Sequence, residues 1–154
     1  MTPKQLIEVN LAVVIQADPD VVGRFYAKLF QRHPELQRLF GRRSQREQEK
    51  MLTEAILAVV GHMEDATWLR DVLRPLGARH VAYGVTEAMY PLVANALIDT
   101  LREVSGAAWS PEVQTAWSDA LNAVAGEMIA GAREVESQRA VTTLRVDNAP
   151  ASAP

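Results

Sequence analysis

The sequence contains no cysteine in its 154 residues, and this absence excludes several kinds of chemistry at once. Disulfide bonds, thiolate metal sites and cysteine nucleophiles all require a thiol. A chain without disulfides fits a reducing compartment, so we expect a cytoplasmic protein.

The chain also lacks a basic excess and a long hydrophobic run. It has 16 lysines and arginines against 19 acidic residues, a formal charge of −3. A surface for nucleic acid needs clustered cations to neutralise phosphates, so we expect no nucleic-acid partner. The apolar runs are far shorter than the roughly 18 residues that span a bilayer, so we expect no membrane partner. The first residues look like a helix start, not a secretory leader.

What the sequence does contain is helical patterning throughout. Apolar residues recur every three or four positions, and no strand pattern is visible. Thr2 with Gln5 and Ser44 with Glu47 form two capping boxes that predict helix starts. In the first helix we expect Leu6, Val9 and Val13 to face inward. We predict an all-α domain over residues 1–136 and a flexible tail over 137–154, where the pattern dissolves.

His80 lies in line with an apolar helical stripe formed by Leu69, Val72, Leu73 and Leu76. We expect Pro75 in the first turn of this helix, where proline is tolerated. Two interpretations of His80 are open. It is either a core histidine bonded to a nearby carbonyl, or a metal ligand facing an apolar cavity.

Two further features need an explanation. Gln48 stands where the stripe of the next helix predicts an apolar residue, and a buried amide is costly without a partner. Tyr26 lies within a dense aromatic cluster, which fits either core packing or a large flat ligand. The charged segment with Arg42, Arg43 and Arg46 also carries Glu47 and Glu49, so we expect a solvated corner there.

The order and spacing of three stretches resemble the single-domain bacterial globins, the haem part of flavohaemoglobins. The stretches are FYAKLFQRHPELQRLF (25–40), REQEKMLTEAILAVV (46–60) and LGARHVAYGVTEAMYPLV (76–93). The resemblance implies a globin fold, a helical sandwich around a haem pocket.

The resemblance also implies roles for individual residues. His80 matches the proximal iron ligand, Phe40 the phenylalanine that stacks on the haem, and Tyr26 and Gln48 the polar distal residues. Leu52 matches the aliphatic residue beside the ligand, while Val85, Tyr90 and Val93 match the proximal wall. Without a Cys-x-x-Cys-His motif the haem would be non-covalent haem b. Arg79 is the nearest cation for its propionates.

The function implied is reversible binding of dioxygen and other diatomic gases. With electrons from a separate reductase, the chain would also convert nitric oxide to nitrate, with Tyr26 and Gln48 as catalytic hydrogen-bond donors. A haem-based gas or redox sensor that signals to a partner is the alternative. A haem-free helical interaction domain is a third hypothesis.

Two departures from flavohaemoglobins shape these expectations. Flavin and nicotinamide domains follow their globin part, whereas this sequence ends at Pro154, so we expect an external reductant. Their proximal glutamate and a supporting tyrosine align with Ala132 and Leu121. We therefore expect weaker electron donation through His80, with its ring bonded to a main-chain carbonyl near Leu76.

Overall fold

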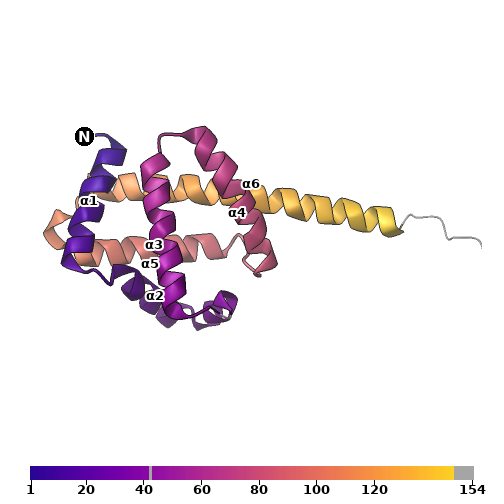
Figure 1. Cartoon of the computed structure of the whole chain (residues 1–154), viewed down its shortest axis with the longest axis horizontal. Coiled ribbons are helices and arrows are strands. Elements are labelled where there is room, and N and C mark those ends of the chain that lie inside the picture. The colour runs from indigo at the N-terminus through magenta and orange to yellow at the C-terminus, as the bar shows by residue number, and fades with distance from the viewer. Residues whose placement is uncertain (42, 148–154) are drawn as a thin grey trace, which may run out of the picture.

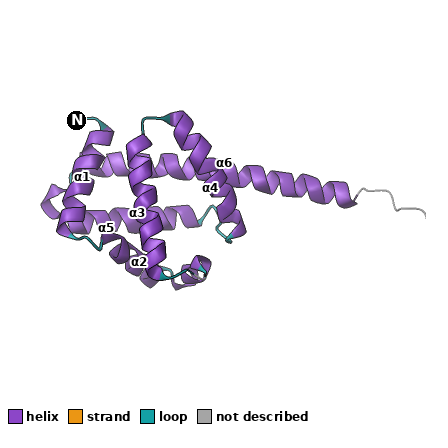
Figure 2. Cartoon of the chain, in the orientation of Figure 1, coloured by secondary structure: helices purple, strands orange, loops and turns teal. Residues whose placement is uncertain are grey.

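The computed structural model describes residues 1–41 and 43–147, and this part of the chain folds into helices without any strand (Figure 2). This confirms the predicted all-α class. The elements are α1 (Pro3–Ala17), α2 (Val21–Arg32), the 3-10 helix η1 (Pro34–Phe40), α3 (Gln45–His62), α4 (Ala66–Ala82), α5 (Met89–Ser105), the 3-10 helix η2 (Gly106–Ala108) and α6 (Pro111–Asp147).

The helix starts follow the local signals in the sequence. Thr2 Oγ1 accepts from Gln5 N at 3.2 Å, and Ser44 Oγ accepts from Glu47 N at 3.2 Å. In both capping boxes the third-position side chain also accepts from the cap backbone N–H. These bonds satisfy amides that the helix itself leaves unpaired, which fixes where α1 and α3 begin.

Figure 1 shows α1 and α3 crossing over α5 and α6, and α4 crossing over α6. The most extensive helix pairing is that of α4 with α6, followed by α2 with α5. The core between the helices contains Ile7, Val14, Phe25, Leu29 and Trp117, all at most 3% exposed.

The inner face of α1 differs from the predicted stripe. Val9 and Val13 are 52% and 36% exposed, whereas Asn10 is buried. Asn10 Oδ1 accepts from Trp117 Nε1 at 2.9 Å, and its Nδ2 donates to Ser105 Oγ at 2.8 Å. The prediction was wrong because α1 is apolar on most sides, and a polar residue that finds two buried partners occupies the core position.

Two glycines allow α4 and α6 to touch through their backbones. A Cβ at Gly77 would lie 1.9 Å from Met128 O, and one at Gly131 would lie 1.9 Å from Arg74 O. Pro75 lies between Arg74 and Gly77, inside the continuous α4 and not in a first turn as predicted. Pro75 is exposed, and the packing of α4 against α6 offsets the helix hydrogen bond that its ring cannot form.

The helix α6 continues past the predicted boundary at residue 136. It extends away from the body of the molecule to Asp147 (Figure 1), and residues 137–146 are exposed. The apolar pattern ends at Ser137 because α6 no longer packs against the other helices beyond that point, although the helix itself continues. The rest of the predicted tail, residues 148–154, lies outside the described residues. Within the described residues, no helix is long and apolar enough to cross a membrane.

Candidate functional site

Three of the predicted site residues, Tyr26, Phe40 and Gln48, meet where α2, η1 and the start of α3 come together. The rings of Tyr26 and Phe40 pack edge to face with centroids 5.4 Å apart. Gln48 Nε2 donates to Phe40 O at 3.1 Å. The odd amide of the α3 stripe therefore has a partner, and one of its two N–H groups remains available.

Tyr26 is 5% exposed, and its hydroxyl forms no hydrogen bond with another residue that the structure describes. Burial, with a smaller contribution from the negative charge of Glu49, raises the pKa of Tyr26 to about 12. The phenol is therefore neutral over the physiological range. A neutral phenol is a hydrogen-bond donor, as the site requires.

His80 lies in the last turn of α4, with its ring partly buried. Its Nδ1 lies 2.7 Å from Leu76 O, as the sequence predicted. A carbonyl only accepts, so Nδ1 carries the proton and Nε2 keeps a free lone pair. An imidazole oriented in this way is prepared to bind a metal through Nε2.

The other proximal residues follow α4 along the chain. Val85 N donates to His80 O at 3.1 Å, which ties this wall residue to the end of the helix. Gly84 allows this turn with a φ of 94°, a conformation that side chains disfavour. Val93 is partly buried on α5 and packs against the core.

Tyr90, near the start of α5, has a buried hydroxyl with no hydrogen-bond partner in the described part of the chain. Burial raises the pKa of this phenol. At the position where the resemblance predicts a glutamate, α6 has the buried Ala132. Tyr90, the predicted proximal tyrosine, therefore has no carboxylate at that position.

Leu52 and Arg79 complete the predicted set. Leu52 is partly buried, one turn after Gln48 on α3, and packs against the core. Arg79 is exposed and forms no ion pair with any described residue. The 3-10 helix η1 lies against the turn that follows α4, because a Cβ on Gly84 would be 3.3 Å from Leu39 Cδ2.

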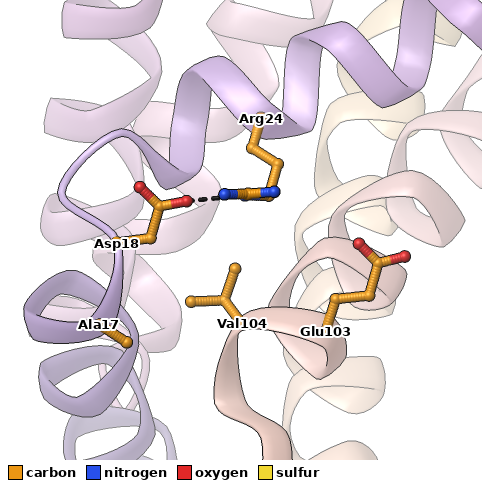
Figure 3. Close-up of a pocket in the computed structure, with 5 residues that line it drawn as sticks. All are labelled: Ala17, Asp18, Arg24, Glu103 and Val104. Carbon is orange, nitrogen blue, oxygen red and sulfur yellow. Dashed lines mark hydrogen bonds and ion pairs between the residues drawn. The ribbon is translucent and has the colours of Figure 1, made fainter.

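A separate surface cavity of about 230 Å³ lies between the end of α1, α2 and α5 (Figure 3). It is lined by Ala17, Asp18, Arg24, Glu103 and Val104, none of which belongs to the predicted site. An ion pair of 2.7 Å between Arg24 Nε and Asp18 Oδ2 lies along its wall. We therefore interpret this cavity as a gap between paired surface side chains and not as a ligand site.

Sequence reasoning missed several residues that shape the site. The ring of Tyr83 packs edge to face on that of His80 with centroids 5.5 Å apart. Their separation of three positions could have predicted this contact, because such residues are neighbours on a helix. Glu49 lies against Gly23 and acts on Tyr26, but only the fold brings it there. Gly77 and Gly131 were visible as glycines inside helical patterns, which usually have a packing reason.

The comparisons with known proteins agree with this architecture. Residues 23–128 match the globin family model, so the chain belongs to the globin family, which is a family of haem proteins. It is 31% identical over 130 residues to a flavohemoprotein of Rhizobium meliloti and 27% identical over 136 residues to one of Bacillus subtilis. These alignments cover 83% and 87% of the chain but 32% and 34% of the relatives, so the chain spans about a third of their length.

Solved structures give the same result for the fold. A bacterial globin from Campylobacter jejuni superposes with a TM-score of 0.75 at 24% identity, covering 88% of this chain and 97% of that one. An engineered carbene transferase, made from a candidate nitric oxide dioxygenase of Rhodothermus marinus, also gives 0.75 at 25% identity. That match covers 90% of this chain and 96% of the other. The predicted globin fold is confirmed.

The residues of this chain fit the haem that the family implies. Among the described residues, His80 Nε2 and the Tyr26 hydroxyl have no hydrogen-bond partner, so both are available to a bound group. Phe40, Leu52 and Val93 are apolar and only partly buried by the protein itself. These are the properties of a site with one protein ligand, an apolar lining and a polar distal group.

Proposed function

We propose that this chain binds haem b through His80 Nε2 and reversibly binds dioxygen and other diatomic gases on the side of Tyr26 and Gln48. The observation that carries the proposal is the bond from His80 Nδ1 to Leu76 O, which directs the other ring nitrogen to a metal. Haem binding would be non-covalent, since the sequence has no cysteine to attach it.

The distal residues discriminate between gases by charge. A bound haem would supply gas binding and electron transfer. The neutral Tyr26 phenol would donate a hydrogen bond to a ligand of anionic character such as dioxygen, and would stabilise the nearly neutral carbon monoxide little. Gln48 contributes its second N–H, while the first holds Phe40 O. The apolar side chains of Phe40 and Leu52 keep water out and strengthen these bonds.

The same arrangement supports turnover of nitric oxide. Nitric oxide and dioxygen would combine into nitrate, and one electron from a separate reductase would restore the ferrous state. Tyr26 and Gln48 would hold the oxygen in place for this reaction. Tyr90, whose hydroxyl has no partner among the described residues, and the Leu76 carbonyl would give His80 less anionic support than a carboxylate would. We therefore propose that gas binding predominates over peroxidase-like chemistry.

Ligand release tests the proposed distal role. A hydrogen bond to a charged acceptor contributes about 1.5–3 kcal/mol, so Tyr26→Phe should speed dioxygen release roughly 10- to 100-fold. Gln48→Leu should have a smaller effect, and the two should be non-additive. Stopped-flow dissociation of dioxygen and carbon monoxide is the measurement, with Gln138→Leu, on the exposed end of α6, as a control away from the site. If both gases were released faster by the same factor, the distal residues would control access and not stabilise charge.

A gas or redox sensor is the second candidate function, and one observation favours it. The α6 extension presents Val141, Leu144 and Val146, which are 47%, 61% and 69% exposed. A partner that reads the state of the haem would find an accessible helix there. A gas-dependent change in the environment of a fluorophore on this extension would support the sensor function, and no change would count against it.

A further inference from the structure

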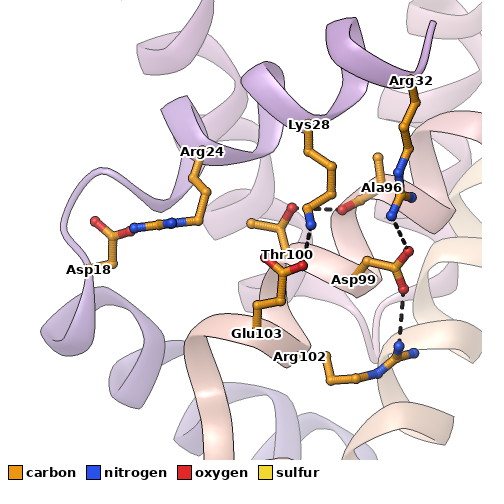
Figure 4. A network of polar contacts seen from close by, with 9 residues as sticks. All are labelled: Asp18, Arg24, Lys28, Arg32, Ala96, Asp99, Thr100, Arg102 and Glu103. Carbon is orange, nitrogen blue, oxygen red and sulfur yellow. Dashed lines mark hydrogen bonds and ion pairs between the residues drawn. The ribbon is translucent and has the colours of Figure 1, made fainter.

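Most cations on the body of the molecule are neutralised by a neighbouring carboxylate. Figure 4 shows a series of such pairs between α2 and α5, where Lys28 binds Glu103 and Asp99 accepts from both Arg32 at 2.8 Å and Arg102 at 3.2 Å. The other paired arginines are Arg24, Arg70, Arg74 and Arg133. Ion pairing is therefore the usual state of a cation on this protein.

The corner between η1 and α3 departs from this pattern. Arg38, Arg43, Arg46 and Lys50 are all exposed, and none forms an ion pair within the described part of the chain. We call these four residues the corner cations. Arg43 contacts the sulfur of Met51 instead of a carboxylate. Arg42 lies outside the described residues and is not one of the four.

The acidic residues of the same segment are engaged elsewhere. Glu47 Oε2 accepts from Ser44 N at 3.3 Å, which places its charge at the positive end of α3. Glu49 accepts from Gln45 Nε2 at 3.1 Å, and its carboxylate lies against Gly23 on α2. The predicted solvated corner holds for the described residues, because Arg43, Arg46 and Glu47 are exposed and only Glu49 is partly buried. The two carboxylates have hydrogen-bond partners within the segment and on α3, so the exposed cations stand there without an ion pair to a described residue.

The corner cations lie on or next to the elements that carry the predicted site residues. Arg38 is on η1 with Phe40, and Arg46 and Lys50 are on α3 with Gln48. On the other side, Arg79 precedes His80, and the contact of Leu39 with Gly84 brings η1 to the end of α4. Exposed cations without an ion pair to a described residue therefore stand on η1, at the start of α3 and in the last turn of α4, the elements that carry Phe40, Gln48 and His80.

We propose that the corner cations and Arg79 form the docking surface for an acidic electron-donor protein. The inference rests on the proposed haem site and names the partner chemistry that would reduce it. Complementary charge steers a partner to one face, and an electron carrier must dock close to the cofactor it reduces. With a flavin donor, the anionic hydroquinone gives one electron and becomes the neutral semiquinone, while ferric haem becomes ferrous.

Charge reversal tests the proposal, with flavodoxin as the acidic probe. The double variant Arg38→Glu/Arg46→Glu reverses two corner cations. Arg139→Glu/Arg145→Glu is the matched control, because both arginines are exposed on the distant α6 extension and change the net charge equally. The measurement is the second-order rate of reduction of the ferric holoprotein by flavodoxin hydroquinone in stopped flow. Binding of oxidised flavodoxin by thermophoresis is a readout independent of reduction.

We expect the corner variant to react roughly 10- to 100-fold more slowly at low ionic strength, with a similar loss of flavodoxin affinity. The control should stay close to wild type. Wild-type rates should fall towards those of the corner variant as salt increases, because screening removes the attraction. Reduction by photoreduced riboflavin, a small donor without an acidic surface, should be the same in all three proteins.

Several results would overturn the proposal. Equal losses in both double variants would indicate net charge and not a docking surface, and unchanged rates would exclude docking there. Faster haem loss with unchanged flavodoxin binding would assign the cations to the propionates. Binding of duplex DNA, lost only in the corner variant, would replace the protein partner with nucleic acid. Failure of the proposed function itself would be seen separately, as the lack of a haem spectrum in wild-type protein.

Discussion

At the scale of single residues, the site depends on side chains whose hydrogen bonds leave one atom free. His80 uses Nδ1 on Leu76 O, and Gln48 uses one N–H on Phe40 O. Tyr26 uses none with the described residues. In each case the remaining donor or lone pair is available to a ligand that the protein does not supply.

The Tyr26 phenol makes a prediction about alkaline stability. Its pKa is about 12 in the folded chain against an ordinary value of 10.0, because burial disfavours the phenolate. A raised pKa contributes stability that is complete below pH 10 and is lost as the pH rises through 12. Wild-type protein should therefore lose unfolding free energy relative to Tyr26→Phe between these values. Urea unfolding of both proteins at increasing pH measures the difference, and parallel curves would contradict the assigned burial.

At the scale of elements, the crossing of α4 and α6 sets the position of His80. Gly77 and Gly131 each face a carbonyl of the opposite helix, so the two backbones are in direct contact three residues before the histidine. A side chain at either glycine would push the helices apart. The crossing therefore links the packing of the last helix to the proximal side of the site.

Substitution of these glycines tests that link. Gly77→Ala should destabilise the protein by about 1–3 kcal/mol or more, because its Cβ meets backbone that cannot rotate away. Gly126→Ala is the matched control on α6, since a Cβ there meets nothing within 4 Å, and it should be neutral or stabilising by up to about 1 kcal/mol. Urea unfolding and the rate of haem loss are the measurements. Similar effects of the two substitutions would show that the crossing is not tight.

How much of the molecule was predictable also differs between elements. The capping boxes at Thr2 and Ser44 and the bond from His80 to Leu76 depend on residues three or four positions apart, and the sequence predicted all of them. The inner face of α1 and the course of α4 through Pro75 depend on partners more than 50 positions away. A helical repeat of apolar residues does not show which distant residues a side chain will contact.

The candidate site shows the same limit. The order of Tyr26, Phe40, Gln48 and His80 was readable as a family resemblance, but their contacts were not. That Gln48 bonds Phe40 O, and that Glu49 turns towards Gly23, follow from how η1 and α2 pack on α3. The lack of ion pairs to the corner cations among the described residues could not be predicted for the same reason. Alternating charges along a chain do not tell which side chains will contact each other.

At the scale of the whole molecule, the packed domain and the end of α6 are distinct. Among the α6 residues up to 146, whose burial the structure describes, Val135 is the last that is partly buried, and residues 136–146 are all exposed. We predict that a chain ending at Glu136 keeps its unfolding free energy to within about 0.5 kcal/mol and its haem affinity unchanged. A chain ending at Glu127 should fail to fold stably, because it lacks Gly131 and the buried Ala132. A loss well above 1 kcal/mol in the longer chain would contradict the boundary at residue 136.

Optical titration of the apoprotein with haem shows whether this globin holds haem through His80. We predict a Soret band that saturates at one haem per chain in the wild type. His80→Ala should lose this band while keeping its far-UV circular dichroism, and added imidazole should restore it by occupying the vacated position. A Soret band of unchanged position and stoichiometry in His80→Ala without imidazole would contradict the account.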